Sequence, residues 1–324
     1  MTLKIERPQL PPAGPAWAGS LMGTSIAATL SHVHHFELLG DVMVVLATAI
    51  LLVIIFGFLK YRNPHFHQEF MGPWGMTSMG ILAWGAAMTS LTGHWSVQAY
   101  AWIIGTALGV VVCLNQLRKF HGAPTFLWGL ALVAPMVGAT VGGQLAQSGF
   151  FSESTSHTIH SLAVVCFFMS FLTAPPTFAR VYLSVIRGNF HLPLGLSGTA
   201  WIPLGIVGQS TAAAQVLAVG DTWKHVGVIY GYVMFTLGIP MFAYAAYKFW
   251  GSLPKIPDYT PGWWGSTFPT GTLCLGSHYL AASSGHAWWD SLSLIFLIIL
   301  FCHWGVSAVR FLGWLSGVPR VSSK

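Results

Sequence analysis

An uninterrupted apolar run at residues 42–59 constrains the fold of this chain more than any other feature. It carries no charge over its whole length, which is close to what a helix needs to cross the hydrocarbon core of a bilayer. Charged residues make up only 7% of the 324 residues, against about 25% in soluble domains. A surface with so few charges does not keep a monomer in water. The sequence therefore excludes a soluble enzyme, a disordered chain and a disulfide-rich scaffold.

Further apolar segments follow along the chain. A membrane-spanning backbone must satisfy its own hydrogen bonds, so runs of this length indicate helices and not the strands of a barrel. We predict an all-α polytopic membrane protein with an N-terminal tail at residues 1–15, a ten-helix transmembrane domain at residues 16–312 and a C-terminal tail at residues 313–324. The predicted spans are residues 16–31, 38–59, 74–91, 97–114, 124–146, 159–179, 192–217, 226–249, 263–282 and 289–312.

The basic residues predict the orientation of these spans. With the N-terminus in the cytoplasm, only Lys224 among the 14 Lys and Arg residues falls on the outer side. This bias is typical of the positive-inside rule. The net charge of +6 is then a topology signal, and no nucleic acid is expected as a partner. We predict a multi-pass protein of the cytoplasmic (inner) membrane, with both termini in the cytoplasm. Its predicted cytoplasmic basic rim consists of Arg118, Lys119, Arg180 and Arg187.

Odd-numbered and even-numbered spans differ in composition. Gly, Ser and Thr account for 36 of 103 residues in the odd spans and for 18 of 109 in the even spans. Small residues allow helices to approach one another closely, whereas helices that face lipid do not need them. The pattern indicates five helical hairpins, each with one inner and one outer helix. Composition alone leaves open whether the inner helices enclose a pore or only pack tightly.

Three prolines fall well inside odd spans, where proline kinks a helix: Pro135, Pro203 and Pro269. No Asp, Glu, Lys or Arg lies within an odd span. A cation pathway usually shows a ring of carboxylates, so a cation channel and a proton pump are disfavoured. An uncharged path lined by hydroxyl groups suits weakly held anions, although water or a neutral solute fits the same lining.

The ninth span carries the most specific motif. The stretch Trp263-Trp264-Gly265-Ser266-Thr267-Phe268-Pro269 resembles the W-W-x-x-T-F-P pattern of the tellurite-resistance/dicarboxylate transporter family. That family includes bacterial TehA-like proteins, the yeast malate permease, fungal sulfite exporters and plant guard-cell slow anion channels. Weaker supporting stretches lie at residues 21–24, 134–137, 202–205 and 208–210.

The resemblance implies five hairpins in a quasi-fivefold arrangement around a central pore, assembly as a homotrimer with one pore per subunit, and Phe268 as the gate. An aromatic ring across a narrow apolar neck blocks ions sterically and by dewetting. Several small or polar side chains are candidates for lining the path. They are Gly23, Thr24, Gln209, Ser210, Thr267, Pro269, Thr270 and Thr272.

Three functions remain open at this point. The first is passive transport of small anions, either inorganic anions or small carboxylates. The second is a proton-coupled transporter for a C4-dicarboxylate or for sulfite on the same fold. The third belongs to another class, a haem- or metal-bearing membrane redox protein that uses histidines such as His157 and His160. We expect a transport protein and not an enzyme, without a cofactor or a metal, and with small anions and the lipid bilayer as its partners.

Overall fold

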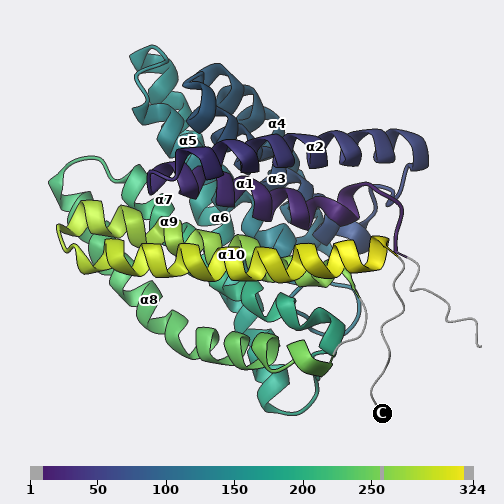
Figure 1. Ribbon diagram of the computed structural model, residues 1–324. Coiled ribbons are helices and arrows are strands. Elements are labelled where there is room, and N and C mark those ends of the chain that lie inside the picture. Colours follow the sequence, from purple (N-terminus) through teal and green to yellow (C-terminus); the bar gives the residue numbers. More distant parts are fainter. Residues whose placement is uncertain (1–9, 256–258, 317–324) are drawn as a thin grey trace, which may run out of the picture.

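The computed structural model describes residues 10–255 and 259–316, and these residues form helices and loops without a strand (Figure 1). Each predicted span corresponds to one α-helix, so the all-α prediction is confirmed. The described part contains ten α-helices. They are α1 (Ala18–Val33), α2 (Glu37–Tyr61), α3 (Met71–Thr92), α4 (Trp95–Arg118), α5 (Trp128–Gln147), α6 (Glu153–Ile186), α7 (Ile202–Leu217), α8 (Asp221–Trp250), α9 (Thr267–Ser284) and α10 (Trp288–Leu315).

Six of these helices are long and apolar enough to cross a membrane, namely α2, α4, α5, α6, α8 and α10. The other four are α1, α3, α7 and α9, all of which belong to the odd-numbered set. Helices α1 and α7 have only 16 residues each, and Gly, Ser and Thr lower the hydropathy of all four. The composition of these helices suits contact with protein and not with lipid.

Burial separates the two sets of helices. In α7, 14 of 16 residues are buried, and in α5 17 of 20. In α6 only seven of 34 residues are buried. Those seven recur every three or four positions from Ile159 to Val181, which places them on a single face of the helix. The remaining surface of α6 is rich in exposed apolar side chains such as Leu172. Even-numbered helices therefore present apolar faces outward, as helices that contact lipid do.

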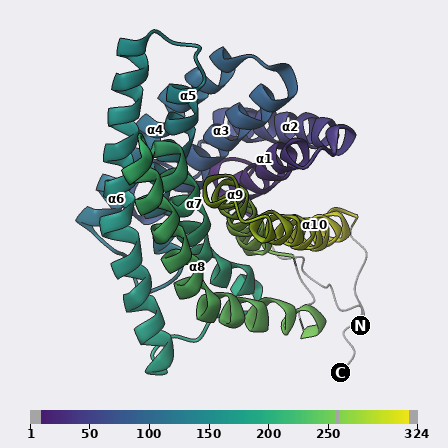
Figure 2. The ribbon, with the colours of Figure 1, turned by 90° about the vertical axis from the view of Figure 1, so that its left-hand side faces the viewer.

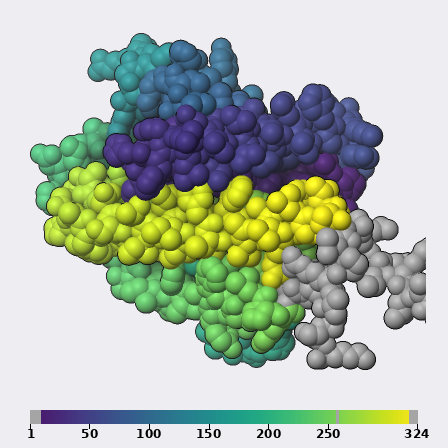
Figure 3. All heavy atoms as spheres, in the orientation of Figure 1, coloured from purple at the N-terminus to yellow at the C-terminus, as the bar shows by residue number. Residues whose placement is uncertain are grey.

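The five odd-numbered helices pack in a closed cycle: α1 contacts α3, α3 contacts α5, α5 contacts α7, α7 contacts α9, and α9 contacts α1. We call this arrangement the five-helix cycle. The other helices lie outside it. Helices α6 and α8 flank α7 (Figure 2), and α10 packs against α9 and α1 and forms a ridge across one face of the molecule (Figure 3).

Glycines permit the closest approaches within the cycle. Between α7 and α9, a Cβ atom on Gly208 would overlap the carbonyl group of Thr272. A Cβ atom on Gly276 would lie 2.6 Å from the carbonyl oxygen of Gly208. Between α1 and α9, a Cβ atom on Gly23 would overlap the side chain of Thr267. The high glycine content of the odd spans thus has a direct structural cause.

Two of the three prolines predicted as kinks lie in the first turn of their α-helices and not in the interior. Pro135 lies inside α5. Pro203 is the second residue of α7, which directly follows the 3₁₀ segment Leu194–Trp201 (η3). Pro269 is the third residue of α9, which directly follows the 3₁₀ segment Pro261–Ser266 (η5). In the first turn the missing N–H of proline has no helical partner to lose. These two prolines therefore mark a change from a 3₁₀-helix to an α-helix and not a kink within an α-helix.

Candidate functional site

A cavity of about 360 Å³ lies at the end of the five-helix cycle where its helices begin. Three odd-numbered helices and the segment before a fourth contribute to it: the first turns of α3 and α5, the first residue of α7 with the preceding η3, and η5 directly before α9. The N-terminus of each α-helix carries a partial positive charge. The polar side chains that line this cavity are Gln68, Glu69, Gln116, His121, Thr125, Thr199 and Thr260.

Apolar side chains occupy the positions one helical turn beyond the cavity lining. Residues three or four apart share a face of a helix, so these positions point in the same general direction as the lining residues before them. For example, Phe268 follows Gly265, a lining residue, by three positions. Its side chain is buried, with 3% exposed. The equivalent buried residues on the other helices are Met79, Val133 and Ile206. We call these four residues the apolar neck.

The chain around Phe268 is held by contacts with the two neighbours of α9 in the cycle. Thr267 lies against Gly23 of α1. Pro269 faces Gly205 of α7, where an added Cβ atom would be 3.7 Å from the proline ring. Small residues on both neighbouring helices therefore allow the segment carrying Phe268 to lie deep in the cycle.

Two of the threonines predicted to line a path point toward the outer helix α10 instead. The Trp304 indole N–H donates to the Thr24 hydroxyl oxygen at 3.0 Å. The Thr270 hydroxyl lies 3.1 Å from Nδ1 of His303 and donates to the Ser266 carbonyl oxygen. Sequence spacing did not reveal these directions, because both partners lie on a helix far along the chain.

Three further predicted lining residues lie against neighbouring groups. Thr267 and Thr272 donate to the backbone of their own segment, to the carbonyl oxygens of Trp264 and Pro269, which is a common use of threonine in apolar helices. Ser210 is fully buried and lies beside Tyr230 of α8.

Gln209 joins two helices of the cycle. Its amide nitrogen donates to the Thr140 hydroxyl of α5 at 2.7 Å. Its carbonyl oxygen is buried and accepts no hydrogen bond from the described residues. Gln209 therefore retains an unused polar atom inside the cycle, and so does Ser210, whose hydroxyl oxygen has no hydrogen-bond partner among the described residues.

The predicted basic rim lies outside the cavity. All four of its residues are exposed, and none lines the cavity. Arg118 is the last residue of α4, and Arg187 follows the last residue of α6. The Arg180 guanidinium lies 5.9 Å from the ring of Trp128, which is a lining residue. The rim residues can thus attract anions toward this end of the protein without holding them in the cavity.

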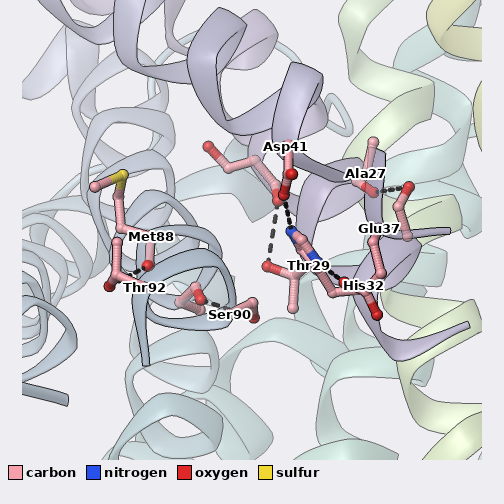
Figure 4. Close-up of polar contacts among 11 residues, drawn as sticks. Ala27, Thr29, His32, Glu37, Asp41, Met88, Ser90 and Thr92 are labelled. Atoms are coloured by element: carbon pink, nitrogen blue, oxygen red, sulfur yellow. Dashed lines mark hydrogen bonds and ion pairs between the residues drawn. The ribbon is translucent and has the colours of Figure 1, made fainter. Parts of the chain in front are cut away.

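A second polar region lies at the opposite end, between α1 and α2 (Figure 4). His32 belongs to α1 and not to a loop, and its imidazole bridges Glu37 at 2.6 Å and Asp41 at 3.5 Å. In the loop that follows, partial burial lowers the pKa of His34 below its usual 6.5. Within the described residues no group of three or more His, Cys, Asp or Glu side chains is placed to hold a metal ion.

Three polar side chains at this same end were missed by sequence analysis. Gln98 of α4 donates to Gln144 of α5 at 3.1 Å, and Gln144 donates to the hydroxyl of Tyr279 of α9 at 2.9 Å. The sequence signals only the two glutamines, because amide side chains are rare in otherwise apolar helices. The pairing itself could not be predicted, because the residues lie 46 and 135 positions apart.

Comparison with known proteins identifies the family. A family model described as voltage-dependent anion channel matches residues 13–312. The chain belongs to the voltage-dependent anion channel family. This confirms the resemblance found in the ninth span, and together with the apolar helices it supports a multi-pass membrane protein that transports anions.

Similar curated proteins carry a more specific name. The sulfite efflux pumps SSU1 of Trichophyton rubrum and of Arthroderma benhamiae are each 24% identical to this member of the family, over 90% of this chain and 87% of the relative. The sulfite efflux pump SSU1 of Arthroderma otae is 22% identical over the same shares. No solved structure matches the chain significantly.

Proposed function

We propose that the protein conducts small anions through the centre of the five-helix cycle, in a quasi-fivefold arrangement, with Phe268 as the gate. One observation carries this proposal. The closed cycle of α1, α3, α5, α7 and α9 has a cavity at one end, and the buried Phe268 ring lies one turn beyond that cavity. A ring in the apolar neck blocks ions by its bulk and by excluding water.

The electrostatics of the path favour anions over cations. The five helices of the cycle contain no Asp, Glu, Lys or Arg between their first and last residues. A permeating anion therefore meets no fixed charge that would trap it, while the helix N-termini and the exposed basic rim lower its energy at the cavity. Glu69 in the lining is the exception, and it lies 3.9 Å from His121.

Sulfite is the first substrate to test, because the similar curated proteins are named sulfite efflux pumps. Two mechanisms remain as candidates, a passive channel and a proton-coupled transporter, for sulfite or for a C4-dicarboxylate such as malate. No carboxylate lies within the helices of the cycle to carry a proton. This absence favours the passive channel.

Reversal potentials in proteoliposomes separate the two mechanisms. We expect the reversal potential of the sulfite current to follow the sulfite gradient at equal pH on both sides. Because the ratio of bisulfite to sulfite changes with pH, the pH gradient is imposed with an anion that stays fully ionised over the pH range, and we expect no shift of its reversal potential. A shift that follows the proton gradient would establish coupling. Malate in place of sulfite tests the dicarboxylate, and liposomes without protein serve as the control.

The redox alternative has a simpler test. His160 Nε2 lies 3.0 Å from the Leu217 carbonyl oxygen, and within the described part of the chain His160 makes no hydrogen bond with a second histidine. We therefore expect the purified protein to show no Soret band in its visible absorption spectrum and no stoichiometric metal by elemental analysis. A Soret band would favour the redox function over transport.

The orientation and assembly are part of the proposal. The distribution of basic residues supports a position in the cytoplasmic membrane with both termini inside, so that the cavity opens to the cytoplasm. We propose a homotrimer with one path in each subunit, in accord with the family resemblance. Light scattering of the detergent-solubilised protein, corrected for bound detergent, measures the number of subunits.

A further inference from the structure

The hydrogen bond between Gln144 and Tyr279 joins two helices that are not adjacent in the five-helix cycle. In the five-helix cycle α7 lies between α5 and α9 on one side, and α3 and α1 lie between them on the other. A side-chain contact from α5 to α9 therefore reaches across the cycle. Gln98 extends the contact on the side of α3 and α4, where its backbone lies next to Gly85 of α3.

This bridge lies far from the apolar neck. Tyr279 is eleven residues beyond Phe268 on α9, which corresponds to about 16 Å along a helix at 1.5 Å per residue. Gln144 lies near the end of α5, three residues before Gln147. The bridge and the apolar neck therefore lie at two separate positions along the same cycle.

The bridge offers hydrogen-bond donors to its surroundings. The Gln144 carbonyl oxygen already accepts from Gln98, and the Tyr279 oxygen already accepts from Gln144. Among the described residues no acceptor is found for the Tyr279 O–H, and each amide has a second N–H. Gln98 is buried, whereas Gln144 and Tyr279 are half-buried. An anion that reaches this position therefore meets O–H and N–H groups at a site that is only partly hydrated.

We propose that Gln98, Gln144 and Tyr279 form a second, polar constriction of the path, which binds the permeating small oxyanion when the Gln144–Tyr279 hydrogen bond opens. The inference rests on the proposed anion path and adds a site of selectivity to it. An oxyanion such as sulfite has several acceptor oxygens and can take bonds from Gln144 and Tyr279 together. A halide lacks that spread of acceptor atoms, so this constriction favours oxyanions.

Removal of the Tyr279 hydroxyl tests the selectivity. We expect Tyr279→Phe, in a Phe268→Ala background, to lower the sulfite-to-chloride permeability ratio roughly two- to tenfold, the factor that one net hydrogen bond supplies. The ring is kept, so the fold is expected to remain. Tyr100→Phe on α4, with Tyr100 exposed on the outer surface, is the matched control and should leave the ratio unchanged. An unchanged ratio in Tyr279→Phe would overturn the inference.

Cysteine accessibility provides an independent test of position. Tyr279→Cys is introduced together with Phe268→Ala and Cys302→Ser, because Cys302 is the exposed cysteine among the described residues. We expect a charged methanethiosulfonate reagent to reduce the anion current through this variant. Ile295→Cys on the outward face of α10 is the control, and its current should not change. Unmodified current through Tyr279→Cys would contradict a place in the path.

The outcomes separate the two proposals. If the Phe268→Ala background carries no anion current although it is folded, the proposed path itself fails. If that background conducts and neither Tyr279 variant alters selectivity or reagent sensitivity, only the second constriction fails.

Discussion

The Phe268→Ala variant is expected to conduct anions at least severalfold faster than the native protein. Phe268 is buried and follows the lining residue Gly265 by three positions, as the buried Met79, Val133 and Ile206 follow lining residues on their own helices by three or four. Truncation to alanine removes the bulk of the ring from the apolar neck and makes room for water, so that both the steric and the dewetting barriers fall. Anion currents in planar bilayers or fluxes from proteoliposomes, normalised to protein content, measure the effect.

A matched truncation separates gating from general loosening of the structure. Phe178 is also buried, but it belongs to the outer helix α6 and packs on Gly129 of α5. Phe178→Ala should lose stability through the cavity it creates, by about 3–5 kcal/mol, without a rise in conductance. Equal conductance in native protein and folded Phe268→Ala would show that the ring does not gate the path.

The alternation of inner and outer helices was the most informative part of the sequence. It is a statistical property of whole segments, and burial follows it: α7 is almost entirely buried, whereas α6 shows one buried face. The same reasoning explains why four helices of the cycle fall short of an ordinary membrane span. Helices surrounded by other helices can be shorter and richer in Gly, Ser and Thr than helices that face lipid.

The direction of individual side chains could not be predicted. Thr24 and Thr270 have the composition expected of lining residues, yet both face α10 through Trp304 and His303. A residue's direction depends on the rotation of its helix and on partners distant in the sequence. The same limit applies to Tyr279, whose partner lies on α5.

Proline positions show a related limit. The sequence predicts the seventh and ninth spans as continuous helices. In the structure each of these spans includes a 3₁₀ segment, and its α-helix starts only at Ile202 or at Thr267. Composition does not distinguish the two helix types, so the sequence predicts Pro203 and Pro269 in the interiors of longer α-helices.

The Gly208→Ala variant is expected to lose much of the stability of the protein. Its new Cβ atom would overlap the carbonyl group of Thr272 and the backbone nitrogen of Leu273. Backbone atoms cannot rotate away as a flexible side chain can, so α7 and α9 must separate. We expect a cost of at least about 3 kcal/mol, the upper end of the usual range for overpacked cores. The melting temperature of the protein in detergent measures it.

The control for this variant is Gly305→Ala on α10. Among the described residues, no heavy atom outside the adjacent backbone of α10 lies within 4 Å of a Cβ atom built there, so the substitution should be neutral or stabilise the helix by up to about 1 kcal/mol through its higher helix propensity. A melting temperature of Gly208→Ala equal to that of the native protein would mean that α7 and α9 are not in backbone contact. That contact positions Thr272 and, one turn earlier on α9, Phe268. A partly folded Gly208→Ala protein should therefore also conduct abnormally, because separation of α7 from α9 opens the cycle beside Phe268.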